Sequence, residues 1–333
     1  MANNKTTVTE LVTGLGMLGL GSIEDALRAE PRQMVSVSPE RWRLLGDLYS
    51  GGALSAEFSA AWSNGQAFLR AADGLRGRVP LTIEWKGGTK APGDEVVPAD
   101  LRIDHVYLVS CKYLSKILHN VSPHYLFERL LAGGQGQRGA DWYLRTAENE
   151  LTALYGMATA AFRSDVPSSP RDLSPGDRLL LTERLGGRWP LEARDLAKEF
   201  SLAVSSRTAS IWMEAMDTES ARERFLWRLL RIGSAPYFVL GSDGRSSLRL
   251  RIQTPWDWKQ QYRLRSWTAT PGSGEQPIVG WAAEVEDHRS GSTVEVTGHV
   301  EIRWSHKKFC GAPEAKLYLD TPHHRVPGYV QLV

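Results

Sequence analysis

The chain has 333 residues and a formal net charge of +2, from 40 Lys+Arg and 38 Asp+Glu. With 42% hydrophobic and 23% charged residues, its composition excludes disordered, collagen-like and highly charged tail proteins. The length predicts two domains, and the 12 tryptophans are unusually many for a residue of cores, interfaces and stacking sites. The near-zero charge excludes coating of nucleic acid by bulk attraction, although a local basic surface is compatible with it.

The cysteines and the apolar pattern bear on the compartment. Cys111 and Cys310 are too few for a disulfide scaffold, and without a CxxC pair they indicate no zinc site. The N-terminus has no apolar run long enough for a signal peptide, and no window of the sequence approaches the roughly 18 apolar residues of a transmembrane helix. We therefore expect a reduced, cytoplasmic protein that does not associate with membranes.

The N-terminal half begins with helical patterns and changes to strand patterns. Helices are predicted within residues 8–48, where Ser38, Pro39 and Glu40 form a helix start, and again over 55–70. The hydrophobic period then becomes two, which predicts strands. These strands cover 81–85, 100–104 and 106–112, with a loop rich in Gly and Pro over 86–98.

The second half contains further helices and then mostly strands. Helices are predicted over 122–131, 141–162 and 219–232, and residues 178–216 are mixed. The Ser/Pro-rich stretch 164–177 is the best candidate for an interdomain linker. Strands are expected over 236–240, 247–253, 278–285, 293–304 and 315–320.

The segment from residue 98 to 113 is the most informative for chemistry. Residues two apart on a strand share a face, so Ser110 and Lys112 point one way, and Val109 and Cys111 point into the core. Asp100 lies on the preceding strand, which a tight turn would make antiparallel to this one.

Asp100, Arg102 and Asp104 share a face of that preceding strand, and the turn falls at Asp104 and His105. One or two carboxylates would therefore lie beside the Lys112 ammonium. Such a pair suits metal-assisted phosphodiester hydrolysis, in which the carboxylate holds Mg²⁺ and the lysine orients or deprotonates water. In the alternative interpretation, Asp100 closes a turn and pairs with Arg102, and Lys112 is a solvated strand end.

This segment resembles the PD-(D/E)xK, or restriction-endonuclease-like, nuclease superfamily. The resemblance covers the order helix, strand, strand, strand, helix over about residues 50–135. By resemblance, Asp100 matches the family's aspartate and Lys112 its lysine, with nine residues between Asp100 and the final triplet. Glu57 and Glu84 match positions at which members carry a further acid.

The triplet reads Ser110-Cys111-Lys112, so serine stands where the family has an acid. A second metal ligand would then come from elsewhere in the chain. Two interpretations stay open: an active nuclease with a changed ligand set, and a core that binds DNA without cutting it. Ser110 would line the site as a hydrogen-bonding group. The candidates for the further ligand are Glu57, Glu84, Asp104 and the backbone carbonyl of Cys111.

The resemblance implies an α/β fold with a restriction-endonuclease-like core, a mixed sheet flanked by helices, and a β-rich C-terminal domain. The expected parts are a helical region at 1–50, the nuclease core at 51–165 and a DNA-recognition domain at 176–333. The implied activity is a DNA endonuclease that uses Mg²⁺ or Mn²⁺, in restriction, phage defence or DNA repair. Cutting both strands implies a homodimer. The alternative is a catalytically inactive DNA-binding or assembly subunit.

A basic, aromatic stretch supports DNA as the partner. Residues 221–265 hold ten Arg or Lys and three acids, interleaved with aromatic residues, which suits contacts to phosphates and bases. A β-rich domain with aromatic core residues and a solvated arginine face is the alternative. Trp256 and Trp258, two apart on one face, are the predicted stacking pocket. The DNA-binding candidates are Arg249, Arg251, Lys259, Arg263, Trp256 and Trp258.

Two further patterns are weaker. Residues 14–19 match a dinucleotide-binding fingerprint, but no strand precedes them and no βαβ unit follows, so a closely packed helix is favoured. The segment Asp320-Thr321-Pro322-His323-His324 suggests a metal, but a third ligand at a defined spacing is missing.

Overall fold

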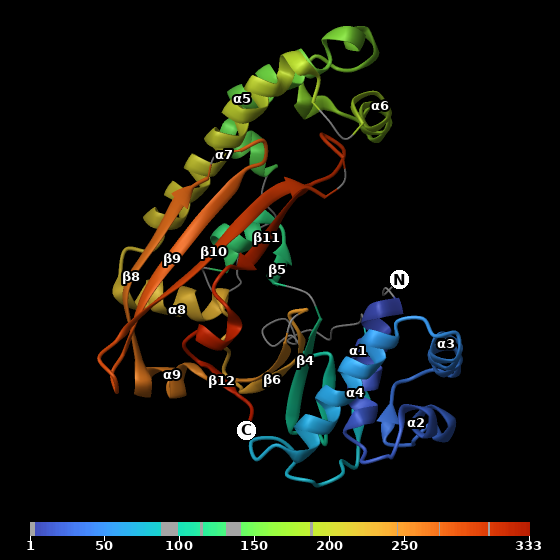
Figure 1. The fold of residues 1–333 in the computed structure, drawn as a ribbon. Helices are drawn as coiled ribbons and strands as arrows, with labels where there is room; N and C mark the ends of the chain where they lie inside the picture. Colours follow the sequence, from blue (N-terminus) through green and yellow to red (C-terminus); the bar gives the residue numbers. More distant parts are fainter. Residues whose placement is uncertain are drawn as a thin grey trace. The chain divides into compact units, whose positions relative to one another are not determined.

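The computed structural model describes residues 4–87, 99–113, 116–130, 141–186, 189–244, 246–272, 274–305 and 307–333. They form a mixed α/β protein, as the sequence predicts, in two units that each combine separate segments of the chain (Figure 1). The first unit comprises 1–116, 231–261 and 322–333, and the second comprises 117–230 and 262–321.

This division differs from the ranges predicted from sequence. The expected boundary at 164–177 lies inside the second unit, and the expected domains 51–165 and 176–333 each contribute to both units. The physical reason is strand pairing over a long sequence separation, because residues 109–113 pair in parallel with residues 238–242 in one sheet. Neither of these strands carries a local signal that identifies its partner.

The first unit contains five helices among its described residues. The short helix α2 is capped by Ser22, whose hydroxyl accepts the Asp25 amide, and Ser38 and Pro39 begin α3 as predicted. These helices are α1 (Asn4–Gly16), α2 (Ile23–Ala29), α3 (Pro39–Ser50), α4 (Ser55–Arg70) and α9 (Pro255–Gln261).

The sheet of the first unit has the order β1-β2-β3-β4-β6-β7-β12. Strands β2, β3 and β4 form an antiparallel meander, and β6 lies parallel to β4. The predicted tight turn between β3 and β4 is present, with Asp104 and His105 both at positive φ, 49° and 58°. The strands are β1 (Met34–Val35), β2 (Ile83–Trp85), β3 (Leu101–Ile103), β4 (Tyr107–Tyr113), β6 (Tyr237–Ser242), β7 (Ser247–Ile252) and β12 (Tyr329–Gln331).

One face of this sheet is buried against helices. Val109 of β4 and Leu240 of β6 are fully buried in a cluster with Leu11 of α1 and Phe68 of α4. Because alternate residues of a strand face opposite ways, Ser110 and Lys112 belong to the other face of the sheet. The candidate site therefore lies on the face opposite the α1 and α4 core.

Helices α1 and α4 cross at glycines, and Figure 1 shows the two helices side by side. A Cβ atom on Gly65 would lie 2.1 Å from the Thr13 carbonyl oxygen, and one on Gly16 would lie 2.5 Å from the Trp62 carbonyl oxygen. Gly16 belongs to the fingerprint-like segment 14–19, in which glycine provides space for a neighbouring helix. Close packing accounts for these glycines without a nucleotide.

Gly65→Ala is expected to destabilise the protein by about 1–3 kcal/mol, the usual cost of overpacking a close contact. Gly46→Ala is the matched control, because Gly46 lies within α3 and no described atom is within 4 Å of its added Cβ. That change should stabilise the protein by up to about 1 kcal/mol through helix propensity. Denaturant midpoints measure both effects. Equal midpoints for the two variants would contradict the close crossing.

The second unit contains a five-stranded antiparallel sheet with the order β5-β11-β10-β9-β8. Helix α7 packs along β8 and β9, and α5 packs against α7. The strands are β5 (Ile117–Val121), β8 (Tyr262–Pro271), β9 (Ile278–Asp287), β10 (Thr293–Trp304) and β11 (Pro313–Leu319). The helices are α5 (Trp142–Ala158), α6 (Pro175–Leu185), α7 (Arg194–Glu214) and α8 (Glu219–Leu229).

Two predicted segments of the second unit form different structures. The predicted helix 122–131 is a π-helix over Tyr125–Arg129. Most of the predicted linker is ordered as short helical turns, and α6 starts within it at a capping box in which Ser174 and Asp177 bond each other's backbone amides. The Ser-Pro-Gly-Asp sequence is thus a helix start. Within the described residues, no helix is both long enough and apolar enough to cross a membrane.

Candidate active site

The Asp100 carboxylate is fixed beside β4. Asp100 immediately precedes β3, and its Oδ2 atom accepts the Cys111 backbone N–H at 2.6 Å and the Ser110 hydroxyl at 3.3 Å. Its own backbone N–H donates to the Val109 carbonyl at 2.8 Å. The side chain therefore takes the place of a backbone acceptor where β3 leaves the ladder, which holds the carboxylate in one position.

Ser110 and Lys112 follow the predicted alternation along β4. Ser110 is 1% exposed, Lys112 is half-buried, and Cys111 packs with the hydrophobic core on the opposite face. Burial, together with the charge of Asp100, raises the pKa of the Cys111 thiol well above its ordinary value. This thiol is therefore no candidate nucleophile at neutral pH.

Glu84 lies on the same face of the sheet but is paired with two cations. Glu84 is directly opposite Arg102 in the β2–β3 ladder, with Arg102 Nη2 2.6 Å from its Oε2 and Lys86 Nζ 3.4 Å from its Oε1. Burial raises the pKa of Glu84, but Arg102 and Lys86 outweigh burial and hold it below its ordinary value. The predicted pairing of Arg102 with Asp100 is replaced by this pair.

The structure assigns Glu57 and Asp104 to other contacts. Glu57, in the first turn of α4, forms an ion pair with Lys5 at 2.7 Å. Asp104 Oδ1 accepts the backbone N–H groups of Leu81 and Thr82 at 2.8 and 2.9 Å, and its Oδ2 pairs with Arg78 at 2.5 Å.

Asp104 as a metal ligand beside Asp100 is therefore wrong. Asp104 lies four positions beyond Asp100, a distance of about 13 Å along an extended strand, and its Oδ1 atom accepts the backbone N–H groups at the start of β2.

The donor set at Asp100 decides how a metal could bind. Throughout the part of the chain that the structure describes, no three His, Cys, Asp or Glu side chains come together as a metal-binding group. Mg²⁺ is often held by one or two carboxylates, with water and substrate phosphate as its other ligands. Asp100 and the Ser110 hydroxyl fit that oxygen chemistry. Glu84 fits it less well, because its charge is balanced by Arg102 and Lys86.

His323, in the C-terminal segment of the first unit, is close enough to Lys112 for the charge of that lysine to affect its pKa, and the sequence interpretation set this residue aside. Burial lowers the pKa of His323, the charges of Lys112 and Lys116 lower it further, and Asp243 opposes them. The His323 ring stacks on the Tyr329 ring at 6.2 Å and 26°. His323 thus lies within electrostatic reach of two lysines, although no local sequence signal connects residues 112 and 323.

His323→Gln is expected to reduce the loss of stability in acid. Because the pKa of His323 is below 6.5 in the folded protein, the unfolded chain binds this proton more tightly and acid favours unfolding. The free energy of unfolding of the wild type should therefore fall more steeply than that of the variant as pH drops below about 6.5. Urea unfolding over this range measures the slopes, and the difference between the proteins should be constant above neutral pH. Parallel slopes in acid would contradict the assignment.

The predicted DNA-binding arginines of β7 face the helical core. Arg249 Nε donates to the Asn64 side-chain oxygen at 2.9 Å, and Asn64 in turn donates to the Gly241 carbonyl at 2.8 Å. Arg251 lies 3.8 Å from the Asp73 carboxylate. Both arginines share one face, as predicted, but their contacts are within the first unit.

The remaining basic candidates do not form one module. Lys259 is exposed on α9 of the first unit, whereas Arg263 lies on β8 of the second and pairs with Glu219 at 3.1 Å. The basic stretch 221–265 is divided in the same way, because residues 221–230 and 262–265 belong to the second unit and residues 231–261 belong to the first. Its charge balance is therefore the sum over residues of two units.

The predicted pocket of Trp256 and Trp258 is wrong, because both residues lie on helix α9 rather than on a strand. Two residues along a helix turn the side chains about 200° apart. Trp256 is 74% exposed, whereas Trp258 is fully buried and donates its indole N–H to the Pro327 carbonyl at 3.2 Å.

No match to the chain was found among protein-family models, curated proteins or solved structures.

Proposed function

We propose that the protein is a metal-dependent DNA endonuclease that hydrolyses phosphodiester bonds, in restriction, phage defence or DNA repair. One observation carries the proposal: the Asp100 carboxylate is fixed by Ser110 and the Cys111 amide beside the strand that bears Lys112. The order of α4, β2, β3 and β4 in a mixed sheet is consistent with the resemblance to PD-(D/E)xK nucleases.

Each residue has a distinct role in the proposed reaction. Asp100 would hold Mg²⁺ or Mn²⁺, with Ser110 hydrogen-bonded to the same carboxylate. The bound metal supplies charge neutralisation at the phosphate. Lys112 orients the attacking water and assists loss of its proton. Because Asp100 is held by two donors before substrate arrives, little reorganisation is required.

The cationic surroundings of Lys112 support a phosphate substrate. Lys112 and Lys116 are each close enough to His323 for their charges to lower its pKa, and Lys116 is exposed. Clustered cations attract phosphate oxygens and stabilise charge that develops on them. Asp243 is the acid that balances this group.

The proposal is tested with supercoiled plasmid DNA in Mg²⁺, in Mn²⁺ and in EDTA. The expected result is nicked and linear DNA in either metal and none in EDTA. Retarded DNA in a gel without cleavage in either metal would favour the inactive DNA-binding subunit. The appearance of linear DNA before nicked DNA accumulates would support paired sites in a homodimer.

A further inference from the structure

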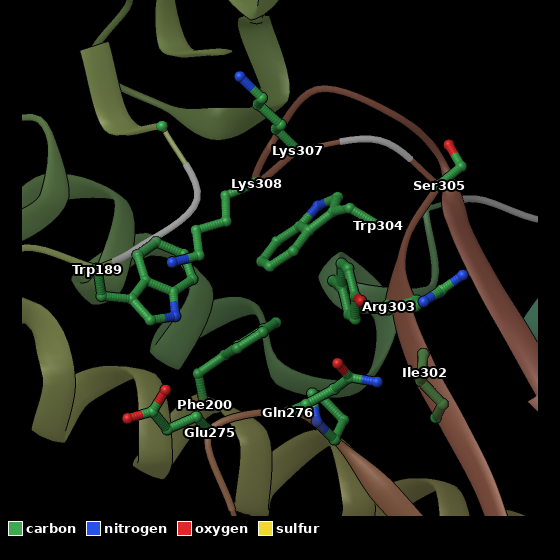
Figure 2. Close-up of a pocket in the computed structure, with 13 residues that line it drawn as sticks. Trp189, Phe200, Glu275, Gln276, Ile302, Arg303, Trp304, Ser305, Lys307 and Lys308 are labelled. Atoms are coloured by element: carbon green, nitrogen blue, oxygen red, sulfur yellow. The ribbon is translucent and has the colours of Figure 1, made fainter. Parts of the chain in front are cut away.

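The second unit contains a cavity of about 360 Å³ at one end of β10, where residues of α5 and α7 also line it (Figure 2). Its volume is in the range of small-molecule sites. Apolar and aromatic side chains form much of the lining, which favours an apolar ligand over a charged one. These side chains belong to Tyr143, Trp189, Phe200, Pro277, Ile302 and Trp304.

The aromatic rings of the lining contact one another. Trp304 meets Trp189 edge to face, with 6.0 Å between the ring centres and an interplanar angle of 68°. Trp304 also stacks on Phe200, with 5.9 Å between the ring centres and an interplanar angle of 18°. The rings therefore form one packed wall, and a ligand would lie against this wall rather than between its members.

Only part of the charge in the lining is directed at the cavity. Arg303 lies 3.8 Å from the Glu314 carboxylate of the neighbouring strand β11. Lys307 is exposed, and Figure 2 shows its side chain pointing away from the aromatic wall. Lys308 and the single acid of the lining, Glu275, remain as the charged groups that act on each other there.

The Lys308 side chain extends toward the aromatic wall (Figure 2). Its Nζ atom lies 4.0 Å from the centre of the Trp189 ring, and among the described residues it has neither a hydrogen-bond acceptor nor a carboxylate within ion-pair distance. Burial lowers the pKa of Lys308 to about 8, and Glu275 opposes this effect. Roughly a fifth of this amine is therefore neutral near pH 7.4, and a neutral lysine in an apolar site is a nucleophile.

The surroundings of Lys308 favour an aldehyde as the electrophile. Carbon dioxide would convert the amine into a carbamate anion, and the lysine that supplied the positive charge of the interior would then be lost. An aldehyde gives an imine, which is neutral or cationic and can keep its position over the Trp189 ring. The apolar lining further favours an aldehyde that carries an aromatic ring.

We propose that Lys308 is a covalent site for a small aromatic aldehyde, which this cavity holds as an imine with its ring against the aromatic wall. The neutral Nζ atom forms a C–N bond to the carbonyl carbon, and the carbonyl oxygen leaves as water with the two hydrogens of the amine. The step needs no oxidant or reductant. It goes beyond DNA cleavage and does not depend on it, because Asp100 and Lys112 belong to the first unit.

Reductive labelling of the full-length protein with two aldehydes tests the proposal. Benzaldehyde carries the aromatic ring, formaldehyde measures amine reactivity alone, and cyanoborohydride traps either imine as a stable amine. Peptide mapping gives the labelling rate of Lys308 relative to Lys307, the adjacent exposed lysine. This ratio should be about tenfold higher for benzaldehyde than for formaldehyde, because burial of the ring in the cavity adds affinity of at least that size.

Three variants assign the adduct to the cavity. Gln276→Trp adds a ring at the lining, so it should lower the benzaldehyde ratio to the formaldehyde ratio. Thr293→Trp is the matched control, since Thr293 is exposed at the start of β10, outside the lining, and this change should leave both ratios as in the wild type. Lys308→Arg keeps the positive charge but should abolish the adduct at this position, with labelling of Lys307 unchanged.

The wild-type protein alone can overturn the proposal. Equal ratios for the two aldehydes would mean that Lys308 is a reactive amine without a binding site for the ring. A raised benzaldehyde ratio that persists in Gln276→Trp, or that is lost in Thr293→Trp, would also overturn the site. A raised ratio that is lost in Gln276→Trp and kept in Thr293→Trp supports it, whether or not the protein cleaves plasmid DNA.

Discussion

Asp100→Asn is expected to lower the rate of DNA cleavage by about 10³-fold, which corresponds to about 4 kcal/mol of transition-state stabilisation. The asparagine keeps an oxygen that can accept the Cys111 N–H and Ser110 hydroxyl, but it removes the charge that would hold the metal. The fold and DNA binding should therefore be retained. Single-turnover plasmid cleavage in Mg²⁺ gives the rate, and anisotropy in EDTA gives the affinity.

Asp100→Ala separates the two roles of this carboxylate. It leaves the Cys111 N–H without its acceptor, so it should also lower the free energy of unfolding by about 1–3 kcal/mol. Glu57→Gln is the matched acid control, since Glu57 pairs with Lys5, and its cleavage rate should remain near that of the wild type. Full cleavage by Asp100→Asn, or equal loss in Glu57→Gln, would exclude the assignment of Asp100.

Lys112→Gln is expected to slow cleavage by about 100-fold while DNA binding changes little. The lysine is proposed to act on the attacking water, so its loss affects the chemical step more than affinity. A weakened rate at saturating enzyme, with an unchanged dissociation constant in EDTA, is the expected signature. Single-turnover rates measured over a series of enzyme concentrations separate the two quantities.

Lys5→Gln is the matched control, because it removes the charge of another lysine. Lys5 pairs with Glu57 and is assigned no part in the reaction. Its cleavage rate should match the wild type. If Lys112→Gln instead weakens binding and leaves the saturated rate intact, Lys112 is a phosphate contact and another group must act on water.

The local part of the first unit could be predicted from the sequence because its signals are local. The residues of α4 and the three short strands were expected from periodicity, and the tight turn predicted at Asp104 and His105 is present, with both residues at positive φ. The alternation of Ser110 and Lys112 against Val109 also follows from strand geometry alone. Such features depend on neighbours within a few residues.

Other features failed for identifiable reasons. The Trp256 and Trp258 spacing was interpreted as a strand, although Thr254 and Asp257 form a capping box around Pro255 that marks the start of α9. That signal was present in the sequence. In contrast, no local pattern could place His323 near Lys112, because that arrangement depends on the order in which distant segments join the sheet.

Glu84 shows a third reason why the sequence alone does not identify the site residues. Its match to a family position gave it a metal-binding role, but a directly opposite strand neighbour decides its partner. The sequence contains Arg102, but it does not show which residue of β2 lies opposite Arg102 on β3, because that depends on the register of the two strands. A carboxylate on the predicted face can therefore be a structural ion-pair partner.

The parallel pairing of β4 with β6 has a consequence for synthesis of the protein. Residues 117–230 intervene between the two strands, and Lys112 pairs in register with Gly241. During translation, Asp100 and Lys112 leave the ribosome well before β6, β7 and β12 exist, and closing so long a segment carries an entropic cost that slows folding. For the proposed nuclease, the nascent chain would carry Asp100 and Lys112 on an incomplete sheet. DNA cleavage would therefore begin only after β6, β7 and β12 have been synthesised and have joined the sheet.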